Sequence, residues 1–199
     1  MYKYWIKMKK TLVYTAIIFT ALACTNRGIT PMGDTDSDYH RLLKSRMLSQ
    51  KYYGIERVAY LTSIVYLSDD IRKAYVDEFA RRYQSTVDEK TALLTSTMQD
   101  AQNYTDFVVI HFASDRKSTK LDASSPIWQI HLAIGNETKL KPTSVTKLPG
   151  EKRVLEYFYP SINQWSYYYL VRFPKQAPGS SLTLHLDSID DNLTFHWNS

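Results

Sequence analysis

The histidines are the side chains of this sequence that could ligate a metal ion. Three of them, His131, His185 and His196, fall on the polar side of segments in which apolar and polar residues alternate. No His-x-His, His-Glu-x-x-His or His/Cys spacing is present, whereas a zinc site needs three or four ligands that converge. His185 and His196 come close together if their segments pair as a hairpin, but two imidazoles do not complete such a site. We therefore predict histidines that face solvent, with no metal and no cofactor.

Groups for covalent or acid–base catalysis are equally sparse. The chain has no Gly-x-Ser-x-Gly turn and no glycine-rich phosphate loop. The neighbouring acids Asp69–Asp70 and Asp77–Glu78 are explained by helix starts and solvated helix faces. An Asp/Glu pair that meets only in the fold would suit glycoside hydrolysis, so a small glycan hydrolase with its cleft between helices and sheets is the alternative left open. We predict no catalytic residue.

The most distinctive segment is aromatic, and it runs from residue 157 to residue 169. Successive side chains of a strand point to opposite faces, so either Tyr167 and Tyr169 or Tyr168 must face solvent or the helices. Because Tyr and Trp are enriched in interfaces and sugar platforms, the segment is a candidate interaction surface. The competing interpretation is that one tyrosine face packs on the helices, which need a surface to bury against, and this interpretation is favoured. The candidate surface residues are Tyr157, Tyr159, Trp165, Tyr167, Tyr168 and Tyr169.

Residues 1–24 are predicted to carry a targeting signal. Four lysines precede an uncharged, mostly apolar run from Thr11 to Ala23, and the one cysteine of the chain, Cys24, follows directly. The run is shorter than the roughly 20 residues that span a membrane as a helix. A basic flank, a short apolar run and a small-residue end are typical of a secretory signal peptide. We expect cleavage after Ala23.

This arrangement resembles the lipobox of bacterial lipoproteins, although Ala21 stands where that motif usually has leucine and Leu22 follows it. The resemblance covers residues 8–24 and implies that Cys24 is lipid-modified and becomes the first mature residue. It also implies a membrane anchor, and Thr25 in place of aspartate favours the outer membrane, facing the periplasm. We expect a non-catalytic, lipid-anchored envelope protein with a protein partner. The alternatives are a plain secreted protein and, for activity, the small envelope glycan hydrolase.

The net charge of the chain gives no support for nucleic-acid binding. The chain has 25 Lys and Arg against 20 Asp and Glu, and four of the basic residues lie in the predicted signal peptide. Removing them leaves 21 basic against 20 acidic residues, which is close to neutral. We therefore predict no nucleic-acid partner.

The predicted secondary structure that positions these groups changes once along the chain, from helices to strands. We predict a signal peptide over residues 1–23, a flexible tether over 24–36, an α-helical region over 37–102 and a β-domain over 103–199. Helix starts are expected at Ser68 and at the Thr86–Glu89 capping box. Residues 141–148 and 154–159 are among the expected strands, the first as an edge strand. The expected fold class is α+β, with a helical bundle packed on or followed by an antiparallel β-sandwich of immunoglobulin-like size.

Overall fold

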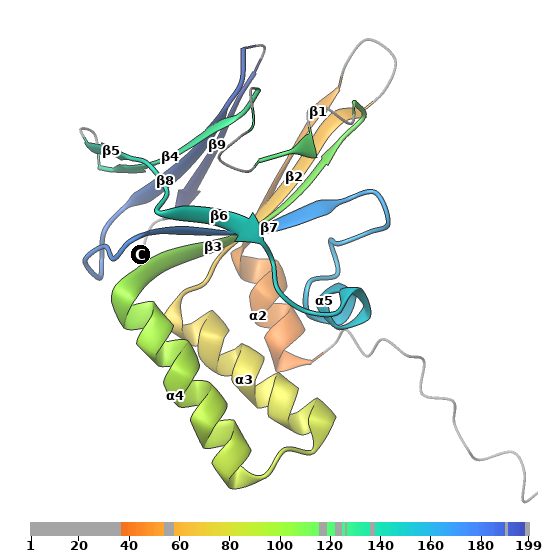
Figure 1. The fold of residues 1–199 in the computed structure, drawn as a ribbon, viewed down its shortest axis with the longest axis vertical. Coiled ribbons are helices and arrows are strands. Elements are labelled where there is room, and N and C mark those ends of the chain that lie inside the picture. Colours follow the sequence, from red (N-terminus) through yellow and green to blue (C-terminus); the bar gives the residue numbers. More distant parts are fainter. Residues whose placement is uncertain are drawn as a thin grey trace, which may run out of the picture. The chain divides into compact units, whose positions relative to one another are not determined.

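The helices and strands of the protein alternate more than the sequence suggests (Figure 1). The computed structural model describes residues 37–53, 58–115, 119–121, 125, 127–135, 138–189 and 191–197. The predicted signal peptide, its cleavage site at Ala23, the lipid-anchored Cys24 and the tether lie outside the described residues. The described chain is mixed α+β, which confirms the expected class. Its elements are α2 (Asp38–Arg46), β1 (Met47–Tyr53), β2 (Val58–Tyr66), α3 (Asp69–Tyr83), α4 (Val87–Asn103), β3 (Tyr104–Ala113), β4 (Gln129–Ile134), β5 (Thr138–Leu140), β6 (Ser144–Lys147), α5 (Lys152–Phe158), β7 (Tyr167–Pro174), β8 (Leu182–Asp187) and β9 (Asn192–Trp197).

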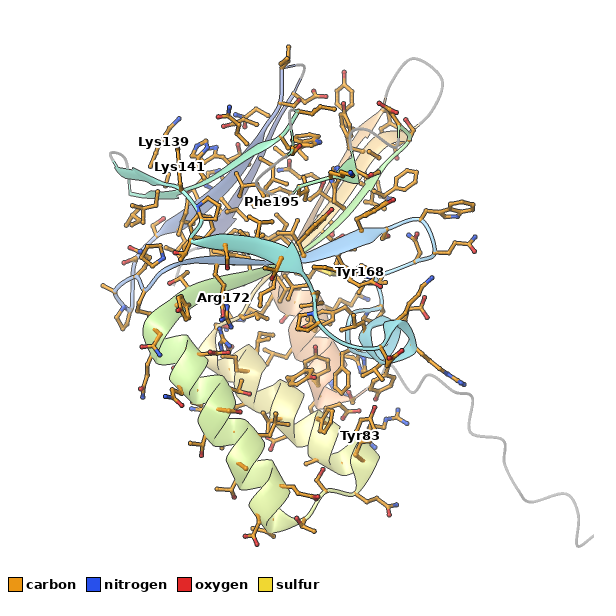
Figure 2. All side chains as sticks on the ribbon, in the orientation of Figure 1. Tyr83, Lys139, Lys141, Tyr168, Arg172 and Phe195 are labelled. Carbon is orange, nitrogen blue, oxygen red and sulfur yellow. The ribbon has the colours of Figure 1, made fainter. Side chains whose placement is uncertain are left out.

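The strands form two antiparallel sheets. The five-stranded sheet has the order β1-β2-β3-β7-β6, and the four-stranded sheet has the order β5-β4-β8-β9. One hydrophobic core draws side chains from both sheets, including Phe107 and Val171 from the first and Leu132, Leu184 and Phe195 from the second. Figure 2 labels Phe195 within this core. A hydrogen bond also joins the two sheets: the side-chain Nε2 of Gln50 on β1 donates to the carbonyl oxygen of Thr194 on β9 at 2.6 Å.

A second core lies on the other face of the five-stranded sheet. It contains Val108 and Ile110 from β3 together with Tyr39, Ile71 and Phe158 from three helices. Strand β3 therefore contributes to a core on each of its faces. This explains why nearly every residue of its run is buried and why the run is apolar without clear alternation.

The helix starts agree with the predictions. Ser68 is the N-cap residue of α3. Thr86 and Glu89 form the predicted capping box at α4, where the Thr86 hydroxyl accepts from the Glu89 amide and the Glu89 carboxylate accepts from the Thr86 amide. The expected edge strand is also present, because β6 ends the five-stranded sheet.

The prediction that residues 37–102 are helical is wrong for Met47–Tyr53 and Val58–Tyr66, which form the antiparallel pair β1 and β2. In β2, Ile64 enters the core between the sheets and Val65 enters the core beneath the helices. Apolar residues on both faces of a strand produce spacings of three and four, which imitate a helix.

The strand expected over residues 154–159 is also wrong, since Lys152–Phe158 is helix α5. Leu155 and Phe158 lie three positions apart and are both buried. On the outer side, Lys152 and Glu156 form an i,i+4 ion pair with 3.7 Å between Nζ and Oε1. Tyr157 and Phe158 therefore belong to a short helix that packs on the core beneath the helices, and not to a strand.

Candidate functional site

The six residues of the predicted aromatic surface do not gather on one face. Tyr159 and Tyr169 are buried, the first in the core beneath the helices and the second in the core between the sheets. Tyr168 packs against the core beneath the helices, and Tyr157 is half-buried beside α3. Figure 2 shows Tyr168 and Arg172, which share one face of β7, on the side toward the helices. The structure thus separates the six residues, and Trp165 and Tyr167 remain exposed.

Tyr157 joins α5 to α3 through a charged cluster. Its hydroxyl donates to the Glu78 carboxylate and accepts from Arg82 Nε at 2.6 Å, and the Arg82 guanidinium lies 4.4 Å from the centre of its ring. Burial raises the pKa of Glu78, but hydrogen bonds from Arg81, Tyr157 and Arg82 prevail and lower that pKa to about 2. This contact supports the interpretation in which a tyrosine of the segment packs on the helices.

Trp165 is presented on a hydrogen-bonded turn. The side-chain Oδ1 of Asn163 accepts from the Trp165 amide at 2.8 Å, and the Asn163 carbonyl accepts from the Ser166 amide at 3.2 Å. Ile162 is buried in the core beneath the helices and fixes the start of the turn there. Trp165 is 64% exposed, and Tyr167, the first residue of β7, is 44% exposed. We call these two residues the aromatic turn.

Exposed aromatic residues also end the edge strand β1. Tyr52 is 45% exposed and Tyr53 is 65% exposed. Tyr52 stacks on Tyr60 with 5.8 Å between ring centres, and Tyr60 stacks on the buried His111 at 6.2 Å. The sequence did not indicate this row, because the segment was predicted as a helix and the rings meet across strands.

Two carboxylates of the kind that a glycan hydrolase needs line one cavity of 230 Å³. Asp106 is completely buried, and its carboxylate lies 2.8 Å from Arg72 Nη2 and 3.3 Å from Arg172 Nε. Arg172 also binds Asp100, with 2.8 Å between Nη2 and Oδ2. Burial raises the pKa of Asp106, although Arg72 and Arg172 act in the opposite direction.

Asp106 is not placed to act as a general acid. A general acid must reach a substrate atom at hydrogen-bond distance, and Asp106 has no exposed surface. Both carboxylates are held by Arg172, which joins α4 to β3 and β7. The network suits a structural role, holding the helices against the five-stranded sheet.

A larger cavity of 450 Å³ lies where β2, β9 and the segment after β7 approach one another. Its apolar lining includes Tyr66 and Trp197, and its charged lining includes Asp70 and Lys175. The size suits a small ligand. Asp70 is already paired with Arg46 at 3.0 Å, and Lys175 donates to the Ala101 carbonyl at 2.5 Å, so these charged groups are engaged within the protein.

The predicted histidines lie on the four-stranded sheet, on the face turned away from the core. His196 is exposed, whereas His131 and His185 are half-buried and stack on each other with 4.4 Å between ring centres. In the β8–β9 hairpin, His185 pairs with Thr194 and His196 with Thr183, while across the sheet His131 pairs with His185. The sequence placed these histidines on polar faces but could not show that β4 lies beside β8.

His131 and Asp187 resemble the base half of a catalytic triad. The Nδ1 of His131 lies 3.0 Å from Asp187 Oδ2. The other ring nitrogen, Nε2, is buried and has no hydrogen-bond partner among the described residues, so no nucleophile stands beside it there. Within the same described part of the chain, no group of three or more His, Cys, Asp or Glu side chains could hold a metal ion.

Comparison of the chain with models of protein families, with curated proteins and with solved structures found no match. Among the residues that the structure describes, no helix is long and apolar enough to cross a membrane.

Proposed function

We propose that this chain is a non-catalytic, lipid-anchored protein of the bacterial cell envelope that binds a protein partner through the aromatic turn. The observation that carries the proposal is the exposure of Trp165, on a turn fixed by Asn163 and Ile162, and of Tyr167 at the start of β7. Tyr and Trp are enriched at the centres of interfaces, where they contribute much of the binding energy. A fixed turn also loses little conformational entropy on binding.

The body of the protein serves, in this proposal, as a rigid support for the turn. The two sheets form a β-sandwich that presents loops at its ends, with helices on the outer face of one sheet. The shared core of Phe107, Leu132, Leu184 and Phe195 supports this arrangement. Trp165 lies just before β7, a strand that contributes Val171 to the same core.

The anchor is Cys24, exposed as the first mature residue when the signal peptide is removed after Ala23. Support comes from the basic start, the short apolar run and the cysteine directly after it. The lipid would hold the protein in the outer membrane with its body in the periplasm. Metabolic labelling with a palmitate analogue tests this step: wild type and Thr25→Ala should label, and Cys24→Ala should not. Equal labelling of wild type and Cys24→Ala would exclude the anchor.

Photo-crosslinking tests the partner surface. A photoreactive amino acid placed at position 165 or 167 should give one discrete adduct in cells that express the full chain. The same amino acid at Tyr83 or Ile189, which are also exposed, should give no such adduct. An adduct of equal intensity at all four positions, or at none, would contradict a binding role for the aromatic turn.

A second candidate function is hydrolysis of an envelope glycan, because Asp100 and Asp106 line one cavity between the helices and a sheet. The ion pairs of both carboxylates with Arg172 count against it. Release of reducing ends from peptidoglycan fragments by wild type but not by Asp100→Asn would favour the hydrolase over the binding protein.

A further inference from the structure

The stacked histidines belong to a hydrogen-bond circuit on the outer face of the four-stranded sheet, which is closed by the stacking of their two rings. His131 lies on β4 and His185 on the neighbouring β8, with ring planes 10° apart and ring centres separated by 4.4 Å. The side chain of His131 is 13% exposed. The two rings are joined, through their Nδ1 atoms, by Asp187, Asn192 and Thr194.

The hydrogen bonds of the circuit assign the ring protons. The Thr194 hydroxyl donates its proton to Asn192 Oδ1 at 2.6 Å, so Thr194 Oγ1 accepts from His185 Nδ1 at 3.3 Å. Asn192 donates its amide to Asp187 Oδ1, and Asp187 Oδ2 accepts from His131 Nδ1 at 3.0 Å. Both neutral rings therefore carry their proton on Nδ1, which leaves each Nε2 as the atom that would take up a further proton.

The geometry makes the two Nε2 atoms unequal. Protonation of His131 would create a donor at a buried atom that has no hydrogen-bond partner among the described residues. Protonation of both rings would also place two positive charges face to face. The parallel planes argue against a shared metal ion, because in-plane lone pairs of parallel rings run side by side and do not converge.

The charges that face the pair come from every strand of the sheet. Burial lowers the pKa of both His131 and His185, while the Asp187 carboxylate raises both. Lys139 of β5 lowers both pKa values, His196 of β9 lowers that of His185, and His185 lowers that of His131. The last effect is the coupling that face-to-face rings require.

We propose that His131 and His185 form a one-proton acid sensor, in which His185 is protonated on acidification and the stacked His131 is kept neutral. This device is independent of the aromatic turn and of the lipid anchor. It changes the charge of the outer sheet face by one unit below neutral pH.

The sensor also makes the stability of the folded protein depend on pH. Because both pKa values are lowered in the folded protein, the unfolded chain binds these protons more readily. The stability that the neutral pair contributes is therefore complete above the ordinary histidine value of 6.5 and declines as the pH falls below it.

NMR titration of the imidazole signals in the full chain, from about pH 4 to pH 8, tests the proposal. His185 should titrate first and below 6.5, and His131 should remain neutral until the pH is lower. His185→Phe keeps a flat ring in the stack but removes its charge, so the titration midpoint of His131 should rise by about half a pH unit, a threefold gain in proton affinity. His196→Gln is the matched control and should leave the His131 midpoint unchanged.

Two results would overturn the proposal: simultaneous titration of both rings near 6.5, or an unchanged His131 midpoint in His185→Phe. If His185→Phe loses its dispersed NMR spectrum, Asp187→Asn provides the second measurement. Removing that carboxylate should lower both midpoints together, and a change in neither would also refute the sensor.

Discussion

Asp106 shows at the scale of one residue how charge holds the layers together. Its carboxylate has no exposed surface and lies between Arg72 of α3 and Arg172 of β7. Arg72 is almost as deeply buried and also donates from Nε to the Leu67 carbonyl at 2.9 Å. A buried ion pair adds little net stability compared with apolar residues, but removing one partner leaves the other charge uncompensated.

We therefore expect Asp106→Asn to lower the free energy of unfolding by about 3 kcal/mol, because it leaves the Arg72 charge buried without an anion. Urea denaturation measures this effect. Asp38→Asn is the control, since Asp38 pairs with Arg41 at an exposed position and should cost less than about 0.5 kcal/mol. Equal effects of the two substitutions would contradict the assigned role of Asp106.

The Glu78 cluster predicts a pH dependence of stability. The pKa of Glu78 is lowered from its ordinary 4.5 to about 2, so the unfolded chain binds the proton more readily than the folded protein. The resulting stability is complete above pH 4.5 and is lost as the pH falls toward 2. Its size is on the order of 2 kcal/mol. Urea denaturation at several pH values in this window should show a shallower decline for Glu78→Gln than for wild type, and parallel curves would contradict the prediction.

At the scale of an element, the stability of α4 depends more on the capping box at its N-terminus than on burial of its side chains. Among its described residues, Ala101 alone is buried, so the capping box must supply stability that burial does not. We expect Thr86→Ala to cost about 1 kcal/mol, because it leaves the Glu89 amide without its acceptor. Thermal unfolding followed by circular dichroism measures the loss. Ser96→Ala, an exposed change in the middle of α4, should be neutral or slightly stabilising.

The whole molecule is expected to unfold as one unit over its described part, because the five-stranded sheet contributes to both cores. Leu184 lies in the core between the sheets and Ile71 in the core beneath the helices, and both are almost fully buried. We expect Leu184→Ala and Ile71→Ala each to cost about 2–5 kcal/mol. Since β3 links the two cores, each variant should lower the midpoint of the same transition.

Two probes of denaturant unfolding check this expectation. Of the described tryptophans, Trp165 is exposed, whereas Trp128 and Trp197 pack in or against the core between the sheets, so the change in fluorescence on unfolding reports mainly that core. Far-ultraviolet circular dichroism reports the helices. The two curves should coincide in wild type and in both variants. A Leu184→Ala variant that loses only the fluorescence signal at low denaturant would show that the layers unfold separately.

The sequence by itself determined what depends on near neighbours in the chain. The Thr86–Glu89 capping box, the start of α3 at Ser68 and the strands after residue 103 whose side chains alternate follow from local pattern. The predicted export signal and lipid anchor at Cys24 also rest on local pattern and stay predictions. Local rules succeed here because capping and alternation need only residues a few positions apart.

Only the tertiary structure decided which residues meet. It made strands of Met47–Tyr53 and Val58–Tyr66. Strand β2 pairs with β3 and has a core on each of its faces, so the spacing of its apolar residues does not distinguish a strand from a helix. It buried Tyr159 and Tyr169 and left Trp165 and Tyr167 exposed. It also placed β4 beside β8, which brought His131 onto His185 across more than fifty positions of chain. Such contacts depend on strand order, which non-local burial selects and the local sequence does not encode.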